Sequence, residues 1–496
     1  HYTYAIVSDG DLMEGVSHEA ASLAGHLSLE KLIYLYDSNS ISIEGETNLA
    51  FTEDVIERFL AYNWQVIKVD GHNHEHIEQT ILKAKTNTEQ PSLIVCETKI
   101  GYGSPNKEGK ESSHGAPLGV DEIRSTKMGY GLNPDDHFHV ERQVYDVFQA
   151  RAELGAALEL DWNNKLTHLE KNDPALYTKY ISWTNQTYLQ NITDVLPEFD
   201  ADSKGIATRT SSGKVINALK DTIPNLIGGS ADLGPSTKTD IVGTGSYTQY
   251  NHKGRIIHFG VREFGMAAAV NGIMLHGGLH AFGATFFVFT DYLRPALRLA
   301  ALMKIPSIFV MTHDSIGLGE DGPTHQPVEH LASLRAMPNV LVIRPADANE
   351  VSHAWKVALE HKTGPSVLVL TRQNVPIYSR NTDNSAELVA KGGYVLSEAE
   401  NGEAEGIVIA TGSEVQLAMQ AQAELAKKGT RVRVVSLPSW ELFDVQSAEY
   451  KNSVLPIHLT KRVSIEAGST FGWQKYLGME GRAIGICLLY TSDAAD

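Results

Sequence analysis

The fold class is indicated by the stretch IPSIFVMTHDSIGLGEDGPTHQP, which covers residues 305–327. Ile305–Met311 is an apolar run, whereas residues 313–327 contain two histidines, three carboxylates, three glycines and two prolines. This composition cannot continue a strand or a helix, so we expect an ordered loop that leaves the carboxyl end of a buried strand in an open α/β sheet. A polar surface loop is the alternative, but so many titratable groups in a segment rich in glycine and proline favour a functional site.

The rest of the chain repeats this alternation of short apolar runs and amphipathic segments in three regions. They cover residues 1 to about 130, 206 to 378 and 388 to 486, and the segment between the first two is polar and helical. This rhythm is typical of parallel sheets covered by helices on both faces. We therefore predict three consecutive parallel-sheet α/β domains at 1–172, 173–382 and 383–486, the first including the helical linker. The predicted strands of the middle domain are Leu226–Gly228, Ile256–Phe259, Ser307–Met311, Val340–Ile343 and Val367–Leu370.

Composition and charge limit the classes of function. The chain has 496 residues, of which 42% are hydrophobic and 21% charged, a balance found in soluble globular proteins, and no apolar run is long enough to span a bilayer. A formal charge of −18 at pH 7 argues against general binding of nucleic acid and favours a small-molecule substrate. With only Cys96 and Cys487, a disulfide framework is implausible, and a reducing cytoplasm is expected.

The two ends of the sequence have unusual features. His1 is not an initiator methionine, and the chain opens almost at once into the strand-like run Tyr4–Val7, so we expect a fragment that starts inside a domain. At the other end, residues 487–496 read as a foreign or out-of-frame tail.

A candidate metal–diphosphate site lies near the start of the chain. The motif Ser8-Asp9-Gly10-Asp11-Leu12-Met13-Glu14-Gly15 follows one predicted strand, and Asn39-Ser40-Ile41 follows the next. The Asp9 carboxylate, the Asn39 amide and a backbone carbonyl are hard oxygen ligands suited to Mg²⁺ or Ca²⁺. Gly10 allows a phosphate to approach the backbone, and the helix from Glu14 points its N-terminus at the same place. An Asp-Gly turn and an Asn helix cap are the alternatives for each piece alone.

These residues resemble a known family. Asp9-Gly10-Asp11 through Glu14-Gly15, followed by Asn39, resembles the thiamine diphosphate-binding motif, and with His114-Gly115-Ala116-Pro117-Leu118 the chain is similar to transketolases over residues 1–486. The resemblance implies the thiamine diphosphate-binding fold type plus a transketolase C-terminal-like domain, and thiamine diphosphate with Mg²⁺, Ca²⁺ or another divalent cation. Metal ligands would be Asp9, Asn39 and Ile41; Ser8 stands where the motif more usually has glycine. By resemblance, an N-terminal segment absent from this sequence would carry further histidines of the pocket, so the fragment by itself is expected to be inactive.

The resemblance also assigns the catalytic cofactor contacts of the middle domain. Glu263, which otherwise reads as a helix-dipole partner, would bind the pyrimidine ring and shift its tautomer, so that a cofactor carbanion and enamine can form. Phe286, Phe289 and Tyr292 are spaced as on one helix face, which is more typical of a core, but by resemblance they wrap the aminopyrimidine.

The substrate contacts also follow from the resemblance. His325 would contact the donor hydroxyl and move protons, Asp321 would bind a sugar hydroxyl, and His313 would lie near the terminal phosphate; His114 would act near the thiazolium. The phosphate would be bound by Arg209, Ser236 and Arg372, although either arginine alone reads equally as a surface ion-pair partner.

The implied activity is transfer of a two-carbon ketol group from a ketose phosphate such as xylulose 5-phosphate to an aldose phosphate such as ribose 5-phosphate, in the pentose phosphate pathway, by a cytoplasmic homodimer. Within this class, dihydroxyacetone synthase shares nearly all these motifs, and deoxyxylulose-phosphate synthase resembles the 313–327 loop less. A non-catalytic thiamine diphosphate-fold subunit is the alternative from another class. In the third domain, Ala410–Glu414 predicts a strand–turn–helix with Ser413 as N-cap, interpreted as structural or regulatory.

Overall fold

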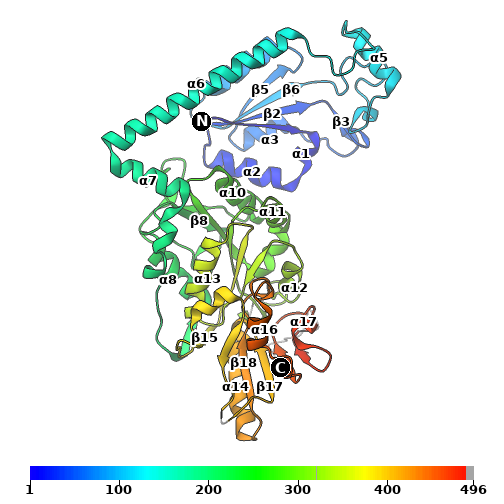
Figure 1. Cartoon of the computed structure of the whole chain (residues 1–496). Helices are drawn as coiled ribbons and strands as arrows, with labels where there is room; N and C mark the ends of the chain where they lie inside the picture. The colour runs from blue at the N-terminus through cyan, green and yellow to red at the C-terminus, as the bar shows by residue number, and fades with distance from the viewer. Residues whose placement is uncertain (320, 401, 487–496) are drawn as a thin grey trace. The chain divides into compact units, whose positions relative to one another are not determined.

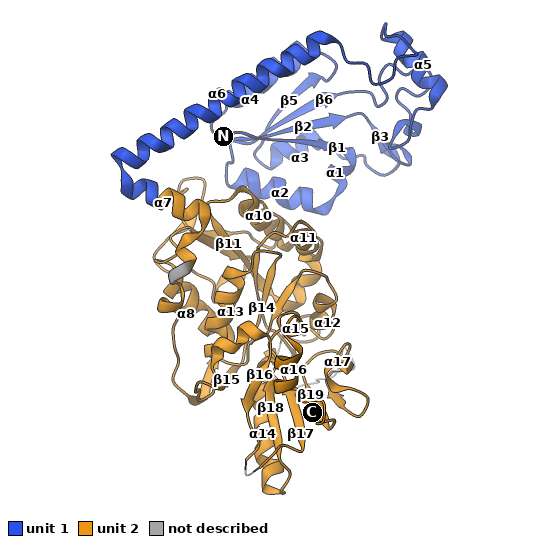
Figure 2. Ribbon diagram, viewed as in Figure 1, with its two compact units in different colours: residues 1–178 blue, residues 179–496 orange. Residues whose placement is uncertain are grey.

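The computed structural model describes residues 1–319, 321–400 and 402–486 (Figure 1). The prediction about residues 487–496, Cys487 included, falls outside the described residues. The chain divides into two compact units, residues 1–178 and 179–496, with the division inside helix α7, Pro174–Asn185 (Figure 2). Among the described residues, none of the helices combines the length and the apolar composition needed to cross a bilayer.

Unit 1 is built on a four-stranded parallel sheet of order β1-β2-β6-β5. Its strands are β1 Thr3–Ser8, β2 Leu32–Ser38, β5 Gln65–Asp70 and β6 Ser92–Glu97. Alternate residues of β6 face opposite cores: Leu93 and Val95 join the cluster of Phe59 and Trp64, whereas Ile94 and Cys96 pack on the other face. Both faces are therefore covered, as predicted for the first domain.

The helices of unit 1 are α1 Asp9–Met13, α2 Gly15–His26, α3 Val55–Ala61, α4 His74–Thr86, α5 Val120–Gly129 and α6 Arg142–Asn172. The short pieces are β3 Ile41–Ser42, β4 Gly45–Glu46, η1 Thr47–Leu49 and η2 Glu111–Ser113. The predicted polar helical segment corresponds to α6, none of whose residues is buried. The helix expected to begin at Glu14 is confirmed within one residue as α2, which begins at Gly15 with Glu14 at its N-cap. The short helix α1 before it was not predicted, and Ser8 and Asp11 form its capping box.

The main sheet of unit 2 has seven parallel strands in the order β13-β14-β12-β11-β8-β10-β9. The strands are β8 Leu226–Ser230, β9 Ser246–Tyr247, β10 Ile256–His258, β11 His280–Phe286, β12 Ile308–Thr312, β13 Leu341–Ile343 and β14 Ser366–Leu370. Helices α8 Thr208–Leu219 and α13 Ala348–Glu360 contribute Val215 and Trp355 to the core on one face. Helix α10 Glu263–His276 packs against β11 and α11 Thr290–Met303.

The sequence-based strands of this domain are confirmed within a residue or two, but the central strand β11 was missed. Its seven residues, HAFGATF, contain Gly283 and small side chains, which weaken the pattern of a strand. Gly283 allows α10 to pack closely, since a Cβ there would lie 3.2 Å from Met266 Cγ and make a tight contact. The remaining short elements are η3 Thr187–Asn191, η4 Thr193–Val195, α9 Gly234–Thr237, η5 Phe287–Phe289, η6 Ile316–Leu318 and α12 His330–Arg335.

The third sheet, also in unit 2, has the order β16-β18-β17-β19-β20, with β16 antiparallel to its neighbour and the others parallel. Its strands are β16 Tyr394–Ser397, β17 Gly406–Ala410, β18 Val432–Ser436, β19 Arg462–Ile465 and β20 Arg482–Ile484. The helices are α14 Val415–Lys427, α15 Trp440–Asp444, α16 Ala448–Val454 and α17 Gln474–Leu477, with η7 Ala386–Lys391 and η8 Gly412–Glu414. A two-stranded antiparallel ribbon, β7 Asp202–Ala207 with β15 Asn374–Ile377, completes the unit.

A buried histidine at the start of β11 makes stability depend on pH. Burial lowers the pKa of His280 to about 3, and the ring forms a hydrogen bond of 3.4 Å with the Tyr188 hydroxyl. An unfolded histidine has a pKa of about 6.5, so between pH 6.5 and 3 only the unfolded state takes up this proton. The contribution of His280 to folding is therefore present above pH 6.5 and is lost as the pH falls toward 3.

We expect His280→Gln to flatten the acid limb of the stability profile by up to about 1.4 kcal/mol per pH unit. The measurement is the free energy of unfolding in urea at pH 7, 6 and 5, with the exposed His276→Gln as the matched control. Equal slopes for the wild-type and His280→Gln proteins would contradict this assignment.

Candidate active site

In unit 1, the predicted metal ligand Asp9 is a buried carboxylate at the start of α1. It is 4% exposed, and Oδ1 accepts a short hydrogen bond from the Tyr36 hydroxyl of β2. Its Oδ2 is buried and has no hydrogen-bond partner among the described residues. A buried carboxylate oxygen left without a donor is costly unless a cation binds it, so Asp9 fits a divalent metal ion.

The register of the first sheet brings the second metal candidate next to Asp9. Ser8 pairs with Asp37 across β1 and β2, so Asp9 and Asn39 follow neighbouring strand ends. The Asn39 Oδ1 accepts a hydrogen bond of 3.0 Å from the Ile41 amide, which fixes the turn and leaves a second lone pair. A cavity of about 410 Å³ opens beside Asp9 and is lined by Tyr36, Ser38 and Ser40 among others.

The other cofactor candidates of unit 1 are exposed. Gly10 and Glu14 lie on the surface of α1 and at its end, and no protein atom lies within 4 Å of the place where a Gly10 Cβ would be. That open space is compatible with a ligand against the backbone. His114 follows η2 and is exposed.

In unit 2, the predicted residues converge because they follow the carboxyl ends of parallel strands. Glu263 starts α10 after β10 and is only 7% exposed. Phe286 ends β11, His313 follows β12 and Arg372 follows β14. The strand order reverses between β8 and β11, which is where ligands bind in open α/β sheets.

The aromatic residues do not share one helix face, so that prediction is wrong. Phe286 ends a strand, Phe289 ends the 3-10 helix η5 and Tyr292 lies in α11. The chain bend still brings the rings together: Phe286 and Phe289 stack with centroids 6.0 Å apart, and Phe289 and Tyr292 meet edge-on at 5.9 Å. Flat apolar rings of this kind can hold an aromatic ligand.

Both histidines of the 313–327 loop contact this aromatic pair. The His313 ring centroid lies 3.7 Å from that of Phe286, and the His325 centroid lies 5.4 Å from that of Phe289. His313 is 2% exposed and has a left-handed backbone with φ of 60°, which is unusual for a residue with a side chain. The loop therefore places both of its histidines against Phe286 and Phe289.

Two arginines make the surroundings of His313 electropositive. Burial lowers the pKa of Arg209, and the charge of Arg372 adds to that shift while Asp321 opposes it. Burial also lowers the pKa of His313 to about 3, and both arginines act in the same direction. The Arg209 Nη1 donates to the backbone carbonyl of Ser236 at 2.8 Å, and its buried Nε has no hydrogen-bond partner among the described residues. An anion is the ligand that such a cluster would bind.

In the third domain, the expected role of Ser413 as a helix N-cap is wrong. Thr411 precedes η8, and Ser413 lies inside it with its hydroxyl donating to Glu414 at 2.6 Å. The turn closes instead around the buried Arg344 of the middle domain. Sequence reasoning missed Arg344 and Tyr36 because each acts through a residue distant in the sequence.

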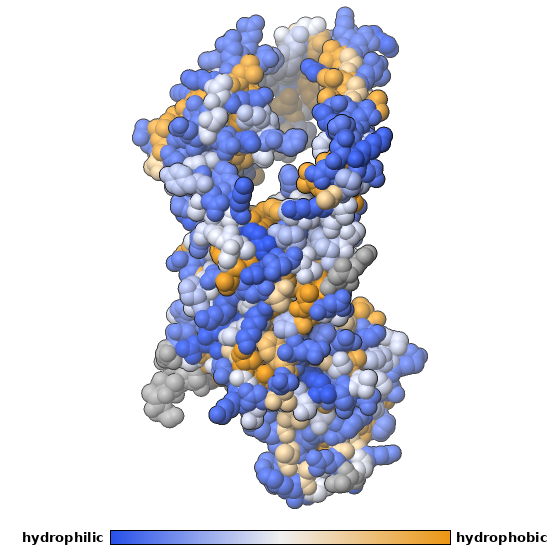
Figure 3. Space-filling view, turned by 90° about the vertical axis from the view of Figure 1, so that its left-hand side faces the viewer, coloured by the Kyte–Doolittle hydropathy of each residue, from blue (hydrophilic) through white to orange (hydrophobic). Residues whose placement is uncertain are grey.

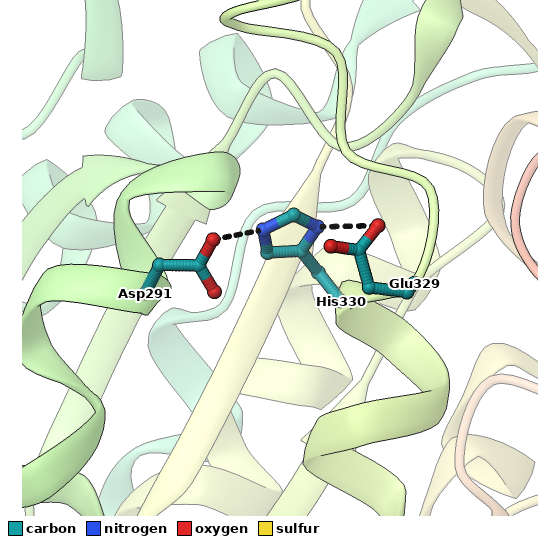
Figure 4. A group of neighbouring side chains, drawn as sticks. All are labelled: Asp291, Glu329 and His330. Carbon is teal, nitrogen blue, oxygen red and sulfur yellow. Dashed lines mark hydrogen bonds and ion pairs between the residues drawn. The ribbon is translucent and has the colours of Figure 1, made fainter. Parts of the chain in front are cut away.

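Sequence reasoning also missed a group formed by Asp291, Glu329 and His330 (Figure 4). The His330 Nε2 lies 3.1 Å from Asp291 Oδ2, and Nδ1 lies 3.9 Å from Glu329 Oε2. Each ring nitrogen thus faces a different, half-exposed carboxylate, so the imidazole bridges α11 and α12 and we assign no metal to it.

The fold, with a candidate cation site and a candidate anion site at the carboxyl ends of parallel strands, is that of an α/β enzyme. Three family models match the chain: the transketolase thiamine diphosphate-binding domain at residues 1–187, the transketolase pyrimidine-binding domain at 204–377 and the transketolase-like C-terminal domain at 392–493. The chain belongs to the transketolase family, a family of transferases.

Relatives and solved structures agree with this membership. The chain is 52% identical over 488 residues to a transketolase of Geobacillus stearothermophilus and 50% identical to that of Bacillus subtilis, covering 98% of this chain and 73% of each relative. It is similar to the structure of transketolase from Leishmania mexicana, with a TM-score of 0.92 and 42% identity over 98% of this chain and 71% of that one. A Pichia stipitis transketolase in complex with sedoheptulose 7-phosphate has a TM-score of 0.90 and 41% identity, over 98% of this chain and 72% of that one. The prediction that the chain is a fragment stays a prediction.

The Tyr36 hydroxyl forms a short hydrogen bond with the Asp9 carboxylate, so its removal should weaken the candidate metal–diphosphate site. We expect Tyr36→Phe to raise the Kd of thiamine diphosphate in the presence of Mg²⁺ by about 10-fold or more, measured by titration calorimetry. The matched control is Tyr34→Phe in the same strand, whose ring packs on Trp64 with centroids 4.9 Å apart. Equal loss of affinity in both variants would contradict a specific role for Tyr36.

Proposed function

We propose that this chain transfers a two-carbon ketol group from a ketose phosphate such as xylulose 5-phosphate to an aldose phosphate such as ribose 5-phosphate, as in the pentose phosphate pathway. The observation that carries the proposal is a side-chain cluster of unit 2, in which His313, Arg209 and Arg372 lie near the stacked Phe286 and Phe289. An aromatic wall next to an anion site suits a cofactor ring beside a sugar phosphate.

In unit 1, Asp9, Asn39 and the carbonyl of Ile41 would hold Mg²⁺, which would in turn hold the diphosphate. The unpartnered Oδ2 of Asp9 supports this assignment, although another divalent cation such as Ca²⁺ has the same ligand preference. Gly10 and Glu14 would border the diphosphate. When bound, thiamine diphosphate supplies a carbon nucleophile and an electron sink.

In unit 2, the buried Glu263 would hold a proton at the pyrimidine nitrogen, and Phe286, Phe289 and Tyr292 would enclose the ring. His325 and His114 would move protons to and from the donor hydroxyl, and Asp321 would bind a sugar hydroxyl. His313 is neutral at pH 7, since its pKa is about 3, and it would donate one hydrogen bond to the phosphate held by Arg209, Arg372 and Ser236.

A homodimer is part of the proposal, with each cofactor held between the first domain of one chain and the pyrimidine domain of another. Supporting it, α11 carries the exposed apolar side chains Tyr292, Leu299, Leu302 and Met303. One face of the protein also has hydrophobic patches on a mainly hydrophilic surface (Figure 3). We also propose a cytoplasmic location, supported by the buried free thiol of Cys96.

The first test is release of glyceraldehyde 3-phosphate from xylulose 5-phosphate with ribose 5-phosphate, in the presence of thiamine diphosphate and Mg²⁺. We expect turnover, and we expect Glu263→Ala to lower kcat by about 100-fold or more, because a positioned proton-transfer group contributes that much. If formaldehyde were a much better acceptor than ribose 5-phosphate, the activity would be that of a dihydroxyacetone synthase. If calorimetry showed no binding of thiamine diphosphate, the chain would be a non-catalytic subunit.

The second test concerns the phosphate. We expect Arg209→Gln and Arg372→Gln each to raise KM for both sugar phosphates by about 10- to 100-fold, because each removes charged hydrogen bonds. Arg255→Gln is the matched control: this half-buried arginine donates to the backbone carbonyls of Lys220 and Pro224 at 2.9 and 2.8 Å. A change in KM as large for Arg255→Gln as for Arg209→Gln would count against the phosphate assignment.

A further inference from the structure

A fully buried arginine links the middle domain to the third domain. Arg344 directly follows β13 and is 0% exposed. Its Nε and Nη2 donate to Asp314 Oδ2 at 3.0 and 2.7 Å. On the other side, Nη1 donates to the Thr411 hydroxyl at 2.9 Å and, through a short bond, to Glu414. The guanidinium therefore binds a carboxylate from each domain at once.

The third domain is shaped to receive this side chain. Gly412 has φ of 51°, and a Cβ there would lie 2.7 Å from Arg344 Nε, so only glycine leaves room. Thr411 in turn donates to Glu466 at 2.6 Å, and Arg335 binds both oxygens of Glu466 at 2.8 Å. The turn of residues 411–414, which the sequence analysis interpreted as structural or regulatory, forms the binding site for the Arg344 side chain.

The other end of the link lies beside the sugar-phosphate pocket. Asp314 is 1% exposed and follows His313 directly, in the loop after β12. His313 keeps its left-handed backbone only because its surroundings hold it, and the carboxylate of the next residue is fixed by two bonds from Arg344. Moving that carboxylate would move the peptide that orients the His313 ring toward Phe286.

We propose that Arg344 and the turn of residues 411–414 form a positioning site for the sugar-phosphate pocket, in which the third domain sets the orientation of His313 through Asp314. The inference rests on the proposed role of His313 at the phosphate. Arg344, Asp314 and Glu414 are positioning residues, because they act through His313.

A second buried network provides the matched control. The Tyr394 hydroxyl of β16 donates to Glu350 of α13 at 2.5 Å, and the Ser436 hydroxyl donates to the same oxygen at 2.7 Å. This network also joins the third domain to the middle domain. It uses α13, and none of its described bonds reaches residues 313–315.

The test compares Asp314→Asn and Glu414→Gln, which keep side-chain shape and remove one charge each, with Tyr394→Phe in the whole chain. We expect the first two to raise KM for xylulose 5-phosphate by about 5- to 30-fold with little change in kcat. Their kcat/KM for unphosphorylated xylulose and their affinity for thiamine diphosphate should stay at wild-type values. Tyr394→Phe should lower the unfolding midpoint and leave KM unchanged. If either charge variant does not fold, Ser413→Ala, which removes a bond of 3.2 Å to Arg344, takes its place.

Combination with His313→Ala separates the two claims. A rise in KM for xylulose 5-phosphate in His313→Ala supports the phosphate role, and no rise refutes that role together with the link built on it. If His313→Ala raises KM, Asp314→Asn in that background should add little, because both act through one side chain. Fully additive effects, or charge variants that alter only the unfolding midpoint, would overturn the positioning site and leave the proposed function intact.

Discussion

The shared direction of the seven strands in the main sheet is the constraint on which the site of unit 2 depends. Parallel strands end at one edge, so Phe286, His313 and Arg372, which follow or end β11, β12 and β14, come together there. Arg209 is brought beside Arg372 by the antiparallel pairing of β7 with β15, in which Ala207 lies opposite Asn374. Packing on both faces fixes the register: Val215 and Trp355 cover one side of the sheet, and α10 covers the other. The buried core therefore fixes the positions of the side chains at this edge of the sheet.

Electrostatics give the two units complementary preferences. In unit 1, a buried carboxylate oxygen of Asp9 has no donor among the described residues and calls for a cation. In unit 2, burial lowers the pKa values of Arg209 and His313, and the charge of Arg372 adds to both shifts. An anion bound beside these side chains would offset that repulsion. Together these preferences match a ligand set that contains a metal-bound diphosphate and a sugar phosphate, which agrees with the membership of the chain in the transketolase family.

The third domain is joined to the middle domain by buried charges rather than by an apolar seam alone. Such networks add little to stability compared with hydrophobic contacts, because desolvating the charges offsets most of the Coulomb attraction. What they do provide is a single geometry, since the guanidinium of Arg344 donates its hydrogen bonds in one plane. That property suits an element that holds the loop carrying His313 in an uncommon backbone conformation.

The sequence by itself determined the α/β class and the order of α/β domains along the chain, and the strands that it predicted for the middle domain were confirmed within a residue or two. These features could be predicted because hydrophobic periodicity and turns of glycine and proline are local properties of the sequence. It also identified the residues at the strand ends, including His313 and Asp9. It missed β11, whose glycine and small residues hide a buried strand, and it wrongly placed Phe286 on a helix face with Phe289. Only the tertiary structure decided that Tyr36 orients Asp9 and that Arg344 links Asp314 to Glu414. These contacts depend on strand pairing and domain packing, which bring together side chains that no local pattern connects.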